Sequence, residues 1–377
     1  KTDMRVHHAV ARVVESRRPL VYLNQIGGQD ELVFDGASFV MNADRTISWQ
    51  LPAWQEELAI TSWKRRGDGW FCEQGNTSNI ESGLESTYQA MTLGLRDYVN
   101  KNGFPGVILG MSGGIDSAIS AAVAVDALGP DRVHCVMMPS PYTSRESLED
   151  AASAAEMLGV KIDTVPIGPA MEAFEDMLSD HFEGSEAGIA EENIQSRSRG
   201  LTLMALSNKL GAMVLSTGNK SEMSVGYATL YGDMCGGYSV LKDVYKMTVF
   251  ELSRWRNKTK PNGSLGPAGT VMPERIISKP PSAELKPDQK DEDTLPPYDE
   301  LDAILHGLIE DEANVQDIAS RGFDIEVVMK IWQMLDRAEY KRRQAPPGVK
   351  IGHRAFGRDR RYPITNSFKA SYQLDNN

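Results

Sequence analysis

Hydrophobic positions in the central part of the chain follow two alternating patterns. Short apolar runs of strand length occur at residues 107–111, 133–138, 161–167 and 212–216. Amphipathic or alanine-rich stretches of helical length separate or flank them, at residues 84–100, 116–128, 144–158, 170–178 and 193–210. Strands and helices that alternate in this way are typical of a doubly wound α/β fold, a Rossmann-like parallel sheet with helices on its faces.

The N-terminal part of the chain has a different pattern. Residues 1–50 contain two strand-like runs, 20–23 and 37–41, joined by a segment punctuated with glycine, which favours sheet. Residues 51–80 show no steady period and predict an extended linker.

Beyond the alternating region the pattern weakens. Residues 257–300 are rich in glycine, proline and charge, which is typical of an active-site lid or an insertion. Two further helices are predicted at 298–310 and 325–340. The segment 341–361 holds eight Lys or Arg and one acid, Asp359. A charged surface packed on an acidic body is favoured over an anion site there.

Composition narrows the class of protein. With 377 residues, the chain is long enough for two or more units. A net charge of −12 argues against binding to nucleic acid, which needs a basic surface. The three cysteines have neither disulfide-framework nor zinc spacing, which fits a cytoplasmic protein. No apolar run has the length of a membrane span, and the first residues lack the character of a signal peptide.

The most informative motif is Ser112-Gly-Gly-Ile-Asp-Ser117, which follows the apolar run 107–111 and opens a helix. Small residues let backbone N–H groups approach an anion, and the helix start adds its free N–H groups and positive dipole end. Asp116 beside a phosphate would repel it unless a cation intervened, so the motif implies Mg²⁺. The alternative is a glycine-rich turn without a ligand. Neither the Walker A ending nor the Gly-x-Gly-x-x-Gly fingerprint is present in this loop.

A second motif of the same form is Ser216-Thr-Gly-Asn-Lys-Ser-Glu222, after the run 212–216. Two such loops at one sheet edge can face one ligand, so that Asp116 and Glu222 share Mg²⁺ while Lys220 and Lys246 neutralise phosphate charge. Glu222 is alternatively an acid that serves only the helix dipole, and both lysines are alternatively solvated.

The first motif resembles the pyrophosphate loop of the N-type ATP pyrophosphatases, and together the two motifs resemble the NAD synthetases. Further matching segments are Glu192 to Arg199, Tyr231 to Gly237, Lys279 to Leu285, Gln289 to Glu292 and Gly348 to Pro363. The match covers about residues 80 to 365. It implies an adenine nucleotide alpha-hydrolase-like fold and the amidation of deamido-NAD to NAD through an acyl adenylate, with release of AMP and pyrophosphate.

Residues 22–36 resemble the late part of the nitrilase-like glutaminase domain that precedes the synthetase in glutamine-dependent NAD synthetases. The resemblance therefore divides the chain into the end of a glutaminase domain (1–50), a linker (51–80), a synthetase domain (81–365) and a tail (366–377). No residue matches the glutaminase nucleophile, and Cys72 comes too late in the chain, so we expect Cys72 to be structural and this chain to use ammonia rather than glutamine. Lys1 and Arg5 are weak candidates for the glutamine pocket.

The resemblance also assigns roles to individual residues. Asp116, Glu222 and Lys246 are the expected catalytic residues, and Asp116 and Glu222 the Mg²⁺ ligands. Expected contacts with the co-substrate ATP are Gly110, Met111, Ser112, Gly113, Gly114, Ile115, Asp116, Ser117, Thr217 and Lys220. Expected contacts with deamido-NAD are Asn193, Arg197, Arg199, Glu222, Asp233 and Lys290. For Arg197 and Arg199, ion pairs with surface acids are an equal alternative.

Other readings remain open. A GMP synthetase or a tRNA-modifying ligase shares the first loop, although acidic charge disfavours tRNA. A catalytically silent nucleotide-binding module is the alternative of another class. The resemblance further implies a homodimer or higher homo-oligomer, with no membrane or nucleic-acid partner.

Overall fold

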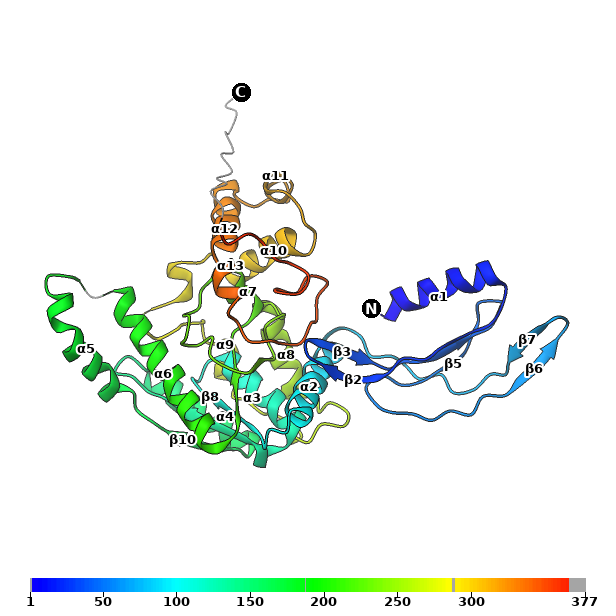
Figure 1. Ribbon diagram of the computed structural model, residues 1–377, viewed down its shortest axis with the longest axis horizontal. Helices are drawn as coiled ribbons and strands as arrows, with labels where there is room; N and C mark the ends of the chain where they lie inside the picture. The colour runs from blue at the N-terminus through cyan, green and yellow to red at the C-terminus, as the bar shows by residue number, and fades with distance from the viewer. Residues whose placement is uncertain (1, 187, 287–288, 366–377) are drawn as a thin grey trace, which may run out of the picture.

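A five-stranded parallel sheet forms the centre of the fold (Figure 1). The computed structural model describes residues 2–186, 188–286 and 289–365. The strand order is β10-β9-β8-β11-β12, and every neighbouring pair is parallel. This confirms the predicted α/β class. The strands are β8 (Val107–Gly110), β9 (Val133–Met137), β10 (Lys161–Thr164), β11 (Met213–Ser216) and β12 (Tyr238–Ser239).

The order of the strands reverses between β8 and β11. From β8 the chain adds β9 and then β10 on one side, and it returns to place β11 on the other side of β8. Val107 pairs with Met213 and Ile108 with Val214, so the two strands end beside each other. In open parallel sheets, ligands bind outside the carboxyl ends of the strands at such a reversal. The two motifs predicted to face one ligand follow these two strands.

Helices cover both faces of the sheet. On one face lies α3, whose alanine-rich sequence lets it pack closely, and every residue of it except Asp116 is buried. On the other face, Leu203 and Leu206 of α6 pack against Ile108, Val136 and Val214. The helices around the sheet are α2 (Gly83–Lys101), α3 (Ile115–Leu128), α4 (Arg145–Leu158), α5 (Gly168–Phe182), α6 (Ile189–Leu210), α8 (Lys246–Lys258) and α9 (Glu274–Ser278).

A second apolar core lies beyond the ends of the strands. It joins the short helix α7 to the helices near the C-terminus, which confirms the two helices predicted there. Its members are α7 (Lys220–Val225), α10 (Tyr298–Ile309), α11 (Val315–Ala319), α12 (Ile325–Arg337) and, adjoining them, α13 (Glu339–Arg342). Single 3₁₀ turns occupy η1 (Pro130–Arg132) and η2 (Asp291–Asp293).

The N-terminal residues form an arm that extends away from the parallel sheet (Figure 1). Its attachment is the β2–β3 hairpin, where Asp97 Oδ2 accepts from the Gly28 amide at 2.8 Å and Lys101 Nζ donates to the Gly28 carbonyl at 2.6 Å. The arm contains α1 (Thr2–Ser16), the antiparallel sheet β1-β4-β5 and two hairpins. Its strands are β1 (Leu20–Tyr22), β2 (Ile26–Gln29), β3 (Leu32–Asp35), β4 (Phe39–Met41), β5 (Ile47–Gln50), β6 (Trp63–Arg66) and β7 (Gly69–Cys72).

The structure corrects two predictions of irregular chain. The predicted linker 51–80 contains the β6–β7 hairpin, whose strands show no clear alternation of buried and exposed positions because most of their residues are exposed. The loop-like region 257–300 contains α9 and η2, which are too short to give a clear period. Helix α1 was not predicted. Within the described residues, no helix has both the length and the apolar character to cross a membrane.

Candidate active site

The first motif forms a tight loop between β8 and α3. The Ser117 hydroxyl accepts from the Ser112 amide at 3.2 Å and donates to the Gly114 carbonyl at 2.9 Å. Gly113 has φ +82°, and a Cβ there would overlap the backbone carbonyl of Ser147 at the start of α4. Only glycine therefore fits this loop without moving α4.

The second motif is locked to the first by an asparagine. Asn219 caps α7, since its side-chain oxygen accepts from the Glu222 amide at 3.0 Å while Glu222 Oε2 accepts from the Asn219 amide at 3.4 Å. Asn219 Nδ2 also donates to Asp116 Oδ1 at 2.9 Å. Asn219 thus holds the carboxylate of Asp116 through its side chain and that of Glu222 through its backbone amide, on the same side of the sheet edge.

Lys246 lies between these two carboxylates. It is the first residue of α8 and is 2% exposed, and its Nζ donates to Asp116 Oδ2 and, at 3.2 Å, to Glu222 Oε1. Burial raises the pKa of Glu222 to about 8, and the nearby charges of Asp116 and Asp291 add to this against the opposing effect of Lys246. Burial alone would lower the pKa of Lys246, but the charges of Asp116 and Glu222 outweigh it and raise that pKa.

These groups open into a cleft of about 590 Å³, a size suited to nucleotides. One wall is the first loop with α3 and the start of α4, and the second is the loop from Thr217 with α7. A third wall is α6 with residues 226–235, and the segment 279–285 with Gln289 and Asp291 forms the fourth. The cleft therefore joins a phosphate-sized cradle to a longer polar surface.

Comparison of the chain with known proteins identifies its family. A family model described as NAD synthase matches residues 87–345. The chain belongs to the NAD synthase family. It is 50% identical over 369 residues to the glutamine-dependent NAD(+) synthetase of Rhodobacter capsulatus, covering 98% of this chain and 67% of the relative. It is also 50% identical to the enzyme of that name from Acinetobacter baylyi, covering 93% and 63%.

Solved structures of related enzymes match the fold of this chain. The glutamine-dependent NAD+ synthetase of Acinetobacter baumannii, in complex with ADP, matches with a TM-score of 0.69 and 46% identity, over 98% of this chain and 66% of that one. The NMN synthetase of Francisella tularensis matches with a TM-score of 0.57 and 28% identity, over 69% and 96%. The chain spans about two thirds of the length of the curated glutamine-dependent relatives.

Most residues predicted to contact ATP in this NAD synthase chain lie at the cleft. Residues 110–117 and Thr217 all line it. Lys220 does not, and that prediction of its position was wrong. Its side chain is 0% exposed, and its Nζ donates to Asp243 Oδ1 and Glu310 Oε1, each at 2.6 Å. The α7 backbone turns Lys220 toward the second core while Glu222, two positions later, faces the cleft.

Four of the predicted dinucleotide contacts line the third wall. Asn193, Arg197, Arg199 and Asp233 are all there. Arg197 Nε donates to the Leu230 carbonyl at 3.2 Å and Arg199 Nε to the Met138 carbonyl at 3.1 Å. Neither arginine forms an ion pair with an acid in the described part of the chain, so the alternative of surface pairing is not what the structure shows.

Two other predicted contacts fall elsewhere. Lys290 is exposed and does not line the cleft, whereas its neighbour Asp291 is 4% exposed and does. Lys1 lies outside the described residues. Arg5 forms an ion pair with Asp35 at 2.6 Å inside the arm. Cys72 is a fully buried residue of the arm, as expected of a structural cysteine.

Sequence reasoning also missed Lys341, which lies in the segment interpreted as a charged surface. Its Nζ donates to the carbonyls of Gly226 at 2.7 Å and Ala228 at 2.6 Å, and the residue lines the cleft. Other basic residues of this segment do pair with acids, such as Lys350 with Asp359 at 2.5 Å. The position of a residue within this basic segment does not show whether its side chain faces the cleft, as Lys341 does, or pairs with an acid elsewhere.

The carboxylates at the cleft suit a hard cation whose coordination is completed by oxygens of a bound ligand. Asp116 and Glu222 both present carboxylate oxygens to the cleft, the donors that Mg²⁺ prefers together with phosphate oxygens and water. Within the described ranges, no three His, Cys, Asp or Glu residues group closely enough to hold a metal by themselves. A cation there would therefore depend on oxygens from the nucleotide.

Proposed function

We propose that this chain catalyses the ATP-dependent amidation of deamido-NAD to NAD through an acyl adenylate. The observation that carries the proposal is the pairing of two strand-to-helix loops across a strand-order reversal, with Lys246 between their carboxylates and a long polar wall beside them. Membership of the NAD synthase family and the relatives named NAD(+) synthetase support this substrate.

The chemistry explains why ATP is needed. A carboxylate does not react with ammonia because oxide is too poor a leaving group. In the proposed first step, an oxygen of the nicotinate carboxylate attacks the α-phosphorus of ATP, and pyrophosphate leaves. In the second step, ammonia attacks the carbonyl carbon of the adenylate, AMP leaves, and a proton is lost to give the amide.

The chain's own groups position these reactants. The Ser112–Gly114 loop holds the departing pyrophosphate through backbone N–H groups and the start of α3. Lys246 offsets the negative charge that develops between the two loops. Asp116 and Glu222 would hold Mg²⁺, which when bound neutralises phosphate charge. Arg197, Arg199 and Asp233 would orient the dinucleotide along α6.

Two broader properties belong to the same proposal. The longer relatives that this chain matches are named glutamine-dependent, so glutamine is the proposed nitrogen source of the whole protein. A homodimer is proposed because α5 and α6 leave apolar side chains exposed to water that a second subunit would cover, including Met177 at 70% and Leu201 at 66% exposed.

The test is a product balance with ATP, magnesium and an ammonium salt. Deamido-NAD should trigger pyrophosphate release in a one-to-one ratio with NAD, whereas nicotinic acid mononucleotide and xanthosine monophosphate should not. Asp116→Ala should abolish this release, while Asp131→Ala, an exposed residue of η1, should leave it unchanged. Release that depends on another acceptor, or no release with deamido-NAD, would refute the proposal.

A further inference from the structure

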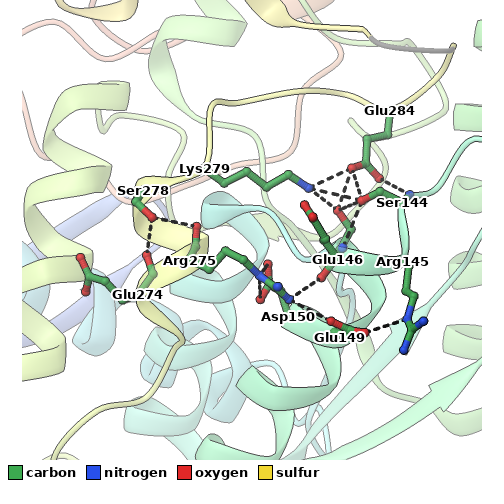
Figure 2. Close-up of polar contacts among 11 residues, drawn as sticks. Ser144, Arg145, Glu146, Glu149, Asp150, Glu274, Arg275, Ser278, Lys279 and Glu284 are labelled. Carbon is green, nitrogen blue, oxygen red and sulfur yellow. Dashed lines mark hydrogen bonds and ion pairs between the residues drawn. The ribbon is translucent and has the colours of Figure 1, made fainter.

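Helix α8 begins with Lys246, and its start is closed by residues of other helices. The first N–H groups of a helix have no partners within it, and the side chain of the preceding residue often supplies one. Ser144 does so for α4, since its hydroxyl accepts from the Ser147 amide at 3.1 Å (Figure 2). Before α8, within the described residues, the corresponding residue is Tyr245, and its side chain makes no capping hydrogen bond. The start of α8 therefore depends on partners from elsewhere in the fold.

Two distant side chains supply these partners. The Ser221 hydroxyl, from α7, accepts from the Lys246 amide at 2.9 Å. Asp302 Oδ2, from α10, accepts from the Met247 amide at 2.7 Å, and Asp302 Oδ1 accepts from the Ser221 hydroxyl at 2.5 Å. The carboxylate thus lies where the helix dipole favours negative charge. Ser221 and Asp302 form one bridge, here named the α8 bridge, which ties three helices together at Lys246.

The α8 bridge is buried and lies behind the cleft. Asp302 is 8% exposed and Ser221 is 0% exposed, and neither is among the described residues that line the cleft. Burial raises the pKa of Asp302 to about 6, against the hydrogen bonds from Met247 and Ser221 and the charge of Lys246. Asp302 therefore remains ionised at neutral pH, and it acts on the cleft only through the residues that it holds.

Helix α10 also contacts the side chain of Lys246. Tyr298 lies four residues before Asp302, on the same face of α10, and its ring centre is 5.1 Å from Lys246 Nζ. Toward the cleft, the same Nζ donates to Asp116 and Glu222. One helix of the second core thus holds Lys246 at its backbone, through the α8 bridge, and at its ammonium group, through an aromatic ring.

We propose that Asp302 is a positioning residue that keeps the ammonium group of Lys246 between the two loops while negative charge develops on the α-phosphate. The inference rests on the proposed function for the reaction that Lys246 serves. Without the α8 bridge, the first turn of α8 loses its two amide partners, and Lys246 shifts with it. Because the charge builds up only in the transition state, this shift slows adenylate formation more than it weakens the binding of ATP or deamido-NAD.

The test is steady-state pyrophosphate release with ATP, magnesium, deamido-NAD and saturating ammonium, with rates taken per folded protein by circular dichroism. Asp302→Ala removes the α8 bridge, and Ser221→Ala removes its hydroxyl. Asp302→Asn keeps it without the charge, since the amide oxygen can accept from the Met247 amide while Nδ2 donates to the Ser221 hydroxyl. The matched control is Asp324→Ala, because Asp324 is a carboxylate that also caps a helix of the second core, α12, at 2.8 Å from the Glu326 amide.

The variants should differ in kcat and not in KM. Asp302→Ala should lower kcat about 100-fold and Ser221→Ala about tenfold, with the KM values for ATP and deamido-NAD within about twofold of the parent protein. Asp302→Asn should keep kcat within about threefold of the parent value, and Asp324→Ala should not change it, because neither displaces Lys246.

Three results would overturn the proposal: an unchanged kcat in Asp302→Ala, KM values that rise as far as kcat falls, or an Asp302→Asn variant as slow as Asp302→Ala. If Asp302→Ala does not fold, Ser221→Ala takes its place in each comparison. Failure of the proposed function would look different, because the parent protein itself would release no pyrophosphate with deamido-NAD.

Discussion

Replacing Glu222 with glutamine should stabilise the protein at neutral pH while it abolishes activity. Burial raises the pKa of this carboxyl from its ordinary 4.5 to about 8, so the folded protein keeps a proton that the unfolded chain releases. pH 7 is about 2.5 units above the ordinary pKa of a glutamic acid in the unfolded chain. Keeping Glu222 protonated in the folded protein therefore costs about 3 kcal/mol of folding free energy. An amide of the same shape avoids this cost.

The pH dependence fixes the sign of the effect. A raised pKa means that the contribution of Glu222 to stability is fully present below pH 4.5 and is lost as the pH rises toward 8. The stability difference between Glu222→Gln and the parent protein should therefore be near zero at pH 4.5 and grow until about pH 8. The assay is urea unfolding at a series of pH values, with Glu274→Gln as the exposed control.

The same group predicts proton release on binding. A cation held by Glu222 needs the ionised carboxylate, so binding of magnesium and ATP near pH 7 should release close to one more proton from the parent protein than from Glu222→Gln. Calorimetry in buffers with different ionisation enthalpies measures that number. A stability difference that does not change with pH, or a variant less stable than the parent protein at pH 8, would refute the reasoning.

Three further substitutions have specific expected outcomes. Gly113→Ala should abolish activity. Gly269→Ala is the control, because Gly269 has the same φ of +82° but open space where a Cβ would lie, and it should retain activity. Equal activity of the two variants would contradict the role given to the close contact between Gly113 and Ser147. Lys220→Met removes the cation between Asp243 and Glu310, which keep hydrogen bonds from backbone amides, and should lower the unfolding free energy by about 3–5 kcal/mol without changing the KM for ATP of the folded fraction. A raised KM at full stability would show that Lys220 contacts ATP. Arg199→Gln should raise the KM for deamido-NAD about tenfold or more and leave the KM for ammonium unchanged, as initial rates would show.

The sequence predicted the parallel sheet and its two loops well because both depend on local patterns. Apolar runs bounded by glycine mark β8 and β11, and their order in the chain places Ser112 and Thr217 at one edge of the sheet. The prediction that Asp116 and Glu222 lie near each other followed from that topology. No side-chain contact needed to be known in advance.

What the sequence did not predict depends on the direction of single side chains. Lys220 and Glu222 are two residues apart on one short helix, and the helix turns one into a buried ion-pair cluster and the other into the cleft. Asp291 and Lys341 reach the cleft only because the distant segments that carry them pack there. Such side-chain positions depend on tertiary packing, and neither hydrophobic periodicity nor residue type predicts them.

Transfer of oxygen from the acceptor to AMP tests the central claim most directly. Deamido-NAD labelled with ¹⁸O in both oxygens of its nicotinate carboxylate is incubated with ATP, magnesium, ammonium and the protein, and the AMP is analysed by mass spectrometry. If the carboxylate attacks the α-phosphorus, each AMP carries one ¹⁸O on its phosphate. Unlabelled AMP, or label found in orthophosphate with ADP as the product, would contradict an acyl adenylate formed in this cleft.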